Sequence, residues 1–418
     1  MKLVSDPVYR TYEKEHKNAL NLNYFVSAKM KLEGGECDYK QAKIVECRLK
    51  KGFNIKEEPS SDSYEYYLHF ADFDRRMDRW IPSEHIRMTN IFIEDEKKKK
   101  DEKDAGHEDD SSDEHEGLGH QHRLIHEELT KLKTIFKVKF GSQYSETWYY
   151  SPFPDEYHDI DCIYYCEFCL GYYVNENELS RHIKDCKLVH PPGNQIYLDK
   201  DSKLSVWEID GHRNPVYCEN LSYLAKLFLD HKLLAHPMEI FLYYCLCQYD
   251  ETGHHLVGYF SKNKYDTQGY NLSCILALPF CQGKGYGQFL ITLSYELSRL
   301  EQKMGTPERP LSDLGKMVYV KWWTEQIVEF IRRKKKEKQA FTLTDISKAT
   351  YITMKDIQYT LEKQNMIKVY KSQLFMCTDE AKLDELCRRP SLLKVVRENI
   401  HWVSYSIKDV ATSTGPFV

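Results

Sequence analysis

Four residues with metal-binding side chains lie close together near the middle of the chain. Two residues separate Cys166 from Cys169, and His182 and Cys186 follow with a spacing of four positions. A tight turn would present both thiols of the first pair to one ion, and positions i and i+4 share one face of a helix. Soft ligands in a tetrahedral set favour zinc. The alternative is a pair of buried thiols beside a core histidine.

The role of such a zinc ion follows from its surroundings. A lone finger could read DNA through its helix, but DNA recognition usually uses tandem fingers. The sequences on both sides, 161–165 before the cysteines and 190–193 after them, read as parts of a larger body. We therefore expect a structural zinc ion.

A second chemical pattern is the glycine-rich stretch at residues 282–287, Gln-Gly-Lys-Gly-Tyr-Gly. It follows a predicted strand and opens a predicted helix, so free backbone N–H groups and the helix dipole would point at one place, which suits a pyrophosphate. The spacing fits neither the P-loop nor the dinucleotide fingerprint. From spacing alone, a flexible turn is an equally good interpretation.

Several longer stretches together resemble the MYST-type histone acetyltransferases. The matching segments, in the order of that family, are the finger, HPPGN at 190–194, FLDHK at 228–232, YNLSCILALP at 270–279, the glycine loop, SYELS at 294–298 and GTPERPLSDLG at 305–315. The resemblance covers roughly residues 130–410. Residues 66–70 and 73–81 are also similar to the chromo-barrel (Tudor-knot) domain of the essential nucleosome-acetylating branch.

The resemblance implies two catalytic residues. A lysine ammonium, with a reference pKa near 10.4, must lose a proton before its nitrogen attacks a thioester, and a positioned carboxylate can accept that proton. By resemblance Glu308 is this general base, although taken alone it reads as a solvated loop charge. Cys274 is by resemblance the active-site cysteine, although in an apolar strand it reads as a packed small side chain. We expect direct attack in a ternary complex rather than transfer through an acetyl-cysteine.

The resemblance also implies a binding site for acetyl-CoA and a modified lysine. The cofactor-binding residues are then Ile275, Leu276, Ala277, Gln282, Gly283, Lys284, Gly285, Tyr286, Gly287, Gln288 and Ser312. Gly283 and Lys284 stand where family members commonly have two arginines, so we expect weaker cofactor affinity without loss of function. Ala277 replaces a usual threonine. Lys232 aligns with the lysine that the family autoacetylates, whereas by itself it reads as an exposed lysine after a helix.

These residues must be positioned by strands, a loop and a helix in series. Residues 241–247, 255–261 and 270–278 have strand-like lengths and mix aromatic with aliphatic side chains. After the glycine loop, apolar residues recur at three- and four-residue spacing from Phe289 to Leu300, which predicts a helix. Residues 134–140 alternate and predict a strand that opens this body.

The C-terminal part predicts a winged helix-turn-helix. An amphipathic helix extends from Leu314 to about Arg332 and leads into the basic run 332–338. Two shorter helices follow, capped by Thr344 and Thr353, and residues 366–370 with 373–377 form a hairpin. The order of helix, helix and β-wing is typical of that unit.

The N-terminal part, with strand-like runs at 39–47 and 64–70, predicts a small all-β domain. Tyr66, Phe70 and Trp80 could form an aromatic cage for methyl-lysine, or could be barrel core. A third interpretation uses the arginines Arg75, Arg76 and Arg79 as an RNA or DNA contact surface.

Charge is distributed unevenly along the chain. The net charge of −5 excludes a wholly polycationic nucleic-acid binder, but residues 94–116 carry twelve acidic residues against five lysines. This almost completely polar segment predicts a disordered tether. Residues 311–418 carry nineteen basic against thirteen acidic residues, which favours a polyanionic partner there. The absence of long apolar runs and of an export signal, with an odd thirteen cysteines, predicts a reduced intracellular protein without a membrane span.

Together these features predict an α+β multidomain chain. The expected parts are a chromo-barrel (1–93), an acidic linker (94–123), an acetyltransferase domain (124–410) and a tail (411–418). The domain would contain the finger (161–190), a GNAT-like acetyl-CoA core (191–315) and a winged-helix-like region (316–400). The resemblance implies a nuclear enzyme that acts on histone tails and nucleosomes within a larger complex. The alternatives are a non-catalytic chromatin or nucleic-acid-binding module, and an acetyltransferase for non-histone proteins or small amines.

Overall fold

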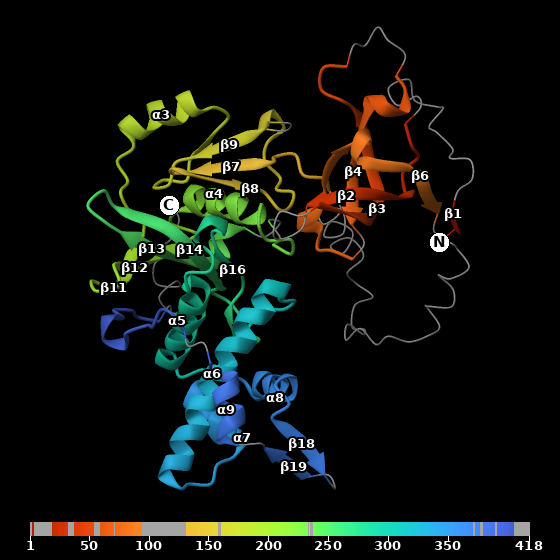
Figure 1. Ribbon diagram of the computed structural model, residues 1–418. Coiled ribbons are helices and arrows are strands. Elements are labelled where there is room, and N and C mark those ends of the chain that lie inside the picture. Colours follow the sequence, from red (N-terminus) through yellow and green to blue (C-terminus); the bar gives the residue numbers. More distant parts are fainter. Residues whose placement is uncertain are drawn as a thin grey trace. The chain divides into compact units, whose positions relative to one another are not determined.

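The computed structural model describes most of the chain outside its acidic segment (Figure 1). The described residues are 2–3, 19–31, 37–53, 59–70, 72–93, 131–157, 160–232, 234, 237–370, 373–376, 379–388 and 391–404. They fall into two units, Met1–Leu124 and Ile125–Val418, which are treated separately below. The predicted linker and tail lie outside the described residues. Within the described residues, no helix is both long and apolar enough to cross a membrane.

The N-terminal unit is an antiparallel sheet of six strands in the order β1-β6-β2-β3-β4-β5. Its strands are β1 (Lys2–Leu3), β2 (Phe25–Lys31), β3 (Cys37–Leu49), β4 (Tyr64–Phe70), β5 (Arg79–Pro82) and β6 (Ile86–Ile93). Along β4, alternate residues from Tyr64 to Phe70 have no exposed surface, as expected for a strand with one face on the core. The predicted all-β domain is confirmed.

The central sheet of the second unit has the order β11-β12-β13-β14-β16, and each neighbouring pair is antiparallel. The strands are β11 (Asn194–Asp199), β12 (Leu204–Asp210), β13 (Phe241–Tyr249), β14 (His254–Asn263) and β16 (Ile275–Ala277). Helix α4 (Pro215–Lys226) follows β12, and α5 (Tyr286–Leu300) packs on β14 and β16 (Figure 1). The predicted series of strand, glycine loop and helix is confirmed, and so is the α+β class.

The predicted strand over residues 270–278 is wrong in one respect, because it is two strands. β15 (Tyr270–Leu272) pairs in parallel with β17 (Thr306–Pro307), whereas β16 pairs with β14. Between them, the Ser261 carbonyl of β14 accepts the Ser273 N–H at 2.7 Å and the Ser261 N–H donates to the Cys274 carbonyl at 2.9 Å, whereas the Cys274 N–H donates to the Ser261 hydroxyl at 3.3 Å. Cys274 therefore lies at a strand break, where the chain changes partners, and not inside an apolar strand.

The finger forms its own small sheet in the order β10-β9-β7-β8. It consists of β7 (Lys137–Phe140), β8 (Gln143–Glu146), β9 (Cys162–Tyr165) and β10 (Tyr172–Tyr173), followed by α3 (Glu176–Asp185). Ile163, Tyr165 and Leu170 belong to the same buried cluster as the central strands. The finger thus shares one hydrophobic core with the central sheet.

The C-terminal region has a second core, built around Trp323 of α6 (Asp313–Glu337). The winged-helix order is confirmed by α7 (Leu343–Thr350), α8 (Met354–Lys363), β18 (Ile367–Tyr370) and β19 (Gln373–Met376), with α9 (Glu380–Leu386) following. Two details of the prediction are wrong. The basic run continues α6 by more than a turn, because lysine and arginine are good helix formers. The cap of α7 is Thr342, not Thr344, whereas Thr353 caps α8 as predicted.

Candidate functional site

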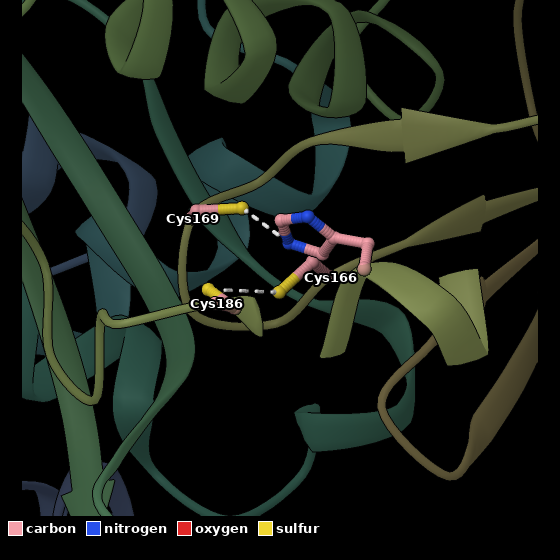
Figure 2. Close-up of side chains that lie close together, drawn as sticks. Cys166, Cys169 and Cys186 are labelled. Carbon is pink, nitrogen blue, oxygen red and sulfur yellow. Dashed lines mark hydrogen bonds between the residues drawn. The ribbon is translucent and has the colours of Figure 1, made fainter. Parts of the chain in front are cut away.

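The four predicted metal ligands converge. The ligand atoms of Cys166, Cys169, His182 and Cys186 all lie within 4.8 Å of one another. The Cys169 Sγ is 3.1 Å from the His182 Nε2, and the Cys166 and Cys186 sulfurs are 3.9 Å apart (Figure 2). The hydrogen bond from the Cys169 side chain lowers the pKa of the Cys166 thiol below its usual value. This set of three thiols and one imidazole fits a closed, structural zinc site.

The finger is attached to the central sheet by polar as well as apolar contacts. The Glu167 carboxylate, within the first cysteine pair, lies 2.7 Å from the Nδ1 of His255 on β14. The Phe168 ring contacts the same imidazole, with centroids 5.4 Å apart. The His254 N–H donates to the carbonyl of Val189, just after the last ligand, at 2.7 Å. A finger held this way supports the body, which agrees with the expected structural role.

The glycine loop has the backbone that an anion site needs. Gly283 and Gly285 have φ values of +77° and +93°, which favour glycine, and Gly285 directly precedes α5. The first N–H groups of a helix have no partner within it, and they carry the positive end of the dipole. Lys284 is exposed beside them. The loop therefore offers backbone donors and one ammonium to a phosphate.

Several of the predicted cofactor-binding side chains have partners within the protein. Gln282 donates to the Ala277 carbonyl at 3.1 Å, and the buried Gln288 donates to Glu325 at 3.2 Å. The Ser312 hydroxyl accepts the Gly315 N–H at 3.1 Å and caps α6. These three side chains shape the loop and the neighbouring helix starts, which leaves mainly backbone groups to face a ligand.

The two predicted catalytic residues are brought to the same strand pair. Glu308 directly follows β17, and its N–H donates to the carbonyl of Leu272, the last residue of β15, at 2.8 Å. Cys274 lies two residues further along and is half-buried, while Glu308 is exposed. Burial is the largest cause that raises the pKa of Tyr270 on β15, and the nearby charge of Glu308 is the second. The chain positions of Glu308 and Cys274 thus both follow closely on the β15–β17 pair.

The loop that carries Glu308 has an anchor that the sequence does not reveal. Arg309 donates from its Nη2 to the Oδ1 of Asp356 on α8, at 2.7 Å. Asp356 is buried and also accepts a hydrogen bond from the Thr353 hydroxyl at 2.8 Å. The capping pattern from Thr353 to Asp356 was readable as a helix start, but nothing local points to Arg309.

Lys232 is not the exposed lysine that its position suggests. Only 6% of it is exposed, and its Nζ lies 5.8 Å from the centre of the Tyr259 ring. Burial holds the pKa of that tyrosine well above its usual value, and among the described residues its hydroxyl has no hydrogen-bond partner. The ammonium therefore lies inside the body.

In the barrel, the proposed aromatic cage is not assembled. Tyr66 and Phe70 are fully buried, and the Tyr66 hydroxyl accepts the Leu20 N–H at 3.2 Å, so both belong to the core. The Trp80 ring is covered by the guanidinium of Arg48, 4.1 Å from its centre.

Comparisons with known proteins agree with this architecture. Residues 190–401 match the MOZ/SAS family, residues 132–186 the MYST family zinc finger domain, and residues 24–88 a family described as an RNA binding activity-knot of a chromodomain. The chain is 43% identical to the Arabidopsis thaliana protein named histone acetyltransferase of the MYST family 1, over 83% of this chain and 77% of that one. It is 37% identical to the Caenorhabditis elegans protein named histone acetyltransferase Tip60 homolog, over 77% and 79% of the two chains.

Members of this family use acetyl-CoA. In this chain, the cluster of three cysteines and one histidine lies in the segment that matches the family's zinc finger, and it supports a structural zinc site there. The family matches cover the finger and the domain that follows it, and a relative of 43% identity matches most of the chain, which therefore belongs to the MYST family of acetyltransferases.

Proposed function

We propose that this chain is a histone acetyltransferase, which moves the acetyl group of acetyl-CoA to lysine side chains of histone tails. The observation that carries the proposal is the β15–β17 pairing, which holds Glu308 beside the strand break at Cys274. Relatives that match most of the chain are named histone acetyltransferases. When bound, acetyl-CoA supplies an acetyl group activated as a thioester.

In this proposal Glu308 is the general base. Its carboxylate is exposed, so an incoming lysine can reach it, while its backbone is held by the bond to Leu272 and by the neighbouring Arg309–Asp356 contact. It accepts the proton from the lysine ammonium, which frees the nitrogen for attack. Cys274 lines the acyl pocket, and transfer is direct within a ternary complex.

Cofactor binding is assigned to the backbone of residues 275–277 and to the loop 282–288. The positive-φ glycines and the start of α5 support a pyrophosphate site there, with Lys284 as its ammonium. Ser312 contributes from the start of α6. We propose the finger (161–190), the acetyl-CoA core (191–315) and the winged-helix-like region (316–400) as the working parts of this domain.

Lys232 is proposed as an autoacetylation site. A buried ammonium is costly unless it is paired, and conversion to a neutral amide removes that cost. Its buried position against Tyr259 supports this, because an acetylated side chain would still have apolar contacts there.

The proposed substrate is chromatin, inside the nucleus and within a larger complex. The basic C-terminal region favours nucleosomal DNA. For the barrel, the cover of Arg48 on Trp80 disfavours a methyl-lysine ligand at that ring, and the match to an RNA-binding knot supports a nucleic-acid contact.

Labelled acetyl-CoA tests the proposal directly. The protein is incubated separately with nucleosomes, free core histones and the small amine spermine. We expect label in the histones and little in spermine. Exclusive labelling of spermine would support a small-amine enzyme, and no labelling together with retained nucleosome binding would support a non-catalytic chromatin module.

A further inference from the structure

The carboxylate of Glu325, in the middle of α6, joins three parts of the catalytic domain. Its Oε2 accepts a hydrogen bond from the Gln288 side chain at 3.2 Å and another from the Ser391 hydroxyl at 2.7 Å. Its Oε1 lies 3.9 Å from the Nζ of Lys321, one turn earlier on the helix. The side chain of Glu325 is only 14% exposed, so these are not interchangeable surface contacts.

Gln288 lies in the first turn of α5, directly after the glycine loop. Its side chain is 8% exposed. Glu325 thus fixes the start of the helix whose N–H groups face the loop. Helix α6 also approaches the glycine loop directly, since a Cβ built at Gly287 would lie 3.9 Å from the Cγ1 of Val318 on α6.

Ser391 begins the C-terminal strap, defined here as residues 391–404. The strap passes directly over the loop, because a Cβ at Gly285 would lie 3.2 Å from the Cβ of Leu392. It continues along α5, where Arg397 donates to both carboxylate oxygens of Glu296 at 2.7 and 2.9 Å. The His401 N–H then donates to the Ile196 carbonyl on β11 at 2.8 Å. The strap is therefore anchored on both sides of the glycine loop.

We propose that Glu325 is a positioning residue for acetyl-CoA, which locks the start of α5 to α6 and to the C-terminal strap and so keeps the glycine loop in its binding geometry. The inference rests on the proposed assignment of that loop to the cofactor. Glu325 touches no substrate itself. Its loss lets the loop move, which weakens cofactor binding and leaves the binding of a histone tail peptide unchanged.

The test compares Glu325→Ala, Glu325→Gln and the control Glu329→Ala, which removes an exposed carboxylate one turn further along the same helix. Loss of two hydrogen bonds to one carboxylate predicts a KM for acetyl-CoA raised about tenfold in Glu325→Ala. The KM for a histone tail peptide and kcat stay near their original values. Glu325→Gln keeps an acceptor oxygen and recovers most of the affinity, and Glu329→Ala changes neither KM.

An unchanged KM for acetyl-CoA in Glu325→Ala, or an equal rise of both KM values, overturns the proposal. If that variant fails to fold, Ser391→Ala removes only the strap's bond and should raise the KM for acetyl-CoA about threefold; no rise would equally refute the role. Calorimetric titration of coenzyme A into the Lys284→Glu variant distinguishes a failure of the cofactor-site assignment from a failure of the positioning role. Full affinity in Lys284→Glu would reject the loop as the cofactor site, whereas lost affinity there with normal affinity in Glu325→Ala would reject only the positioning role.

Discussion

Replacing Asp356 with asparagine should slow acetyl transfer although the residue lies on α8, outside the proposed site. Asp356 receives the Arg309 guanidinium at 2.7 Å, and Arg309 adjoins the proposed base Glu308. The amide keeps the size of the side chain and its contact with Thr353. The change therefore removes mainly the charge that holds the Glu308 loop in place.

The magnitude follows from the exposure of the two partners. A hydrogen bond between charged groups contributes about 1.5–3 kcal/mol. The Asp356 side chain is 2% exposed but that of Arg309 is 48% exposed, so solvent screening reduces the loss to about 1 kcal/mol. If this loss is expressed in the transition state, kcat falls about fivefold.

Steady-state acetylation of free core histones, with thermal unfolding measured in parallel, provides the assay. The matched control is Asp384→Asn, which breaks the exposed pair of Asp384 on α9 with Arg332 on α6. We expect a lower kcat in Asp356→Asn and unchanged kinetics in the control. A lower unfolding temperature with normal kcat in Asp356→Asn would refute the reasoning, because the contact would then be purely structural.

Three further predictions concern the other parts of the chain. Complete removal of zinc by a chelator should unfold the catalytic body, as followed by circular dichroism, because the finger shares its core; an intact fold without metal would reject the structural role. Cys274→Ala should retain acetylation within a few-fold of the original rate, and loss of all transfer would favour an acetyl-cysteine route. Deletion of residues 94–116 should leave acetylation of a free histone tail peptide unchanged; a faster reaction would show that the acidic segment competes with basic tails.

Local patterns were enough to predict the parts of the site that are close in sequence. The spacing of Cys166, Cys169, His182 and Cys186 predicts the metal cluster without knowledge of the fold. Likewise the apolar repeat after the glycine loop predicts α5, in which Phe289, Leu290, Leu293 and Leu297 are buried in one core. Resemblance to the family, not residue chemistry, singled out Glu308 and Cys274.

Long-range pairings could not be predicted in this way. Residues 270–278 read as one strand because they mix aromatic and aliphatic side chains over a strand-like length, yet β15 pairs with residues 306–307 outside the central sheet. The Arg309–Asp356 and Gln288–Glu325 contacts join residues 47 and 37 positions apart. Only the packing of α5, α6 and α8 brings these side chains together. In α6, the apolar pattern ends at Arg332 and predicts the end of the helix there, whereas helix propensity and the Lys334–Glu337 ion pair extend it.

The most direct test of the central claim is the kcat of Glu308→Gln on free core histones. The amide keeps the shape of the side chain but cannot accept the lysine proton. General-base catalysis predicts a fall in kcat of about 10²–10⁴-fold at neutral pH, with coenzyme A affinity unchanged. Full activity in Glu308→Gln would contradict the proposed mechanism.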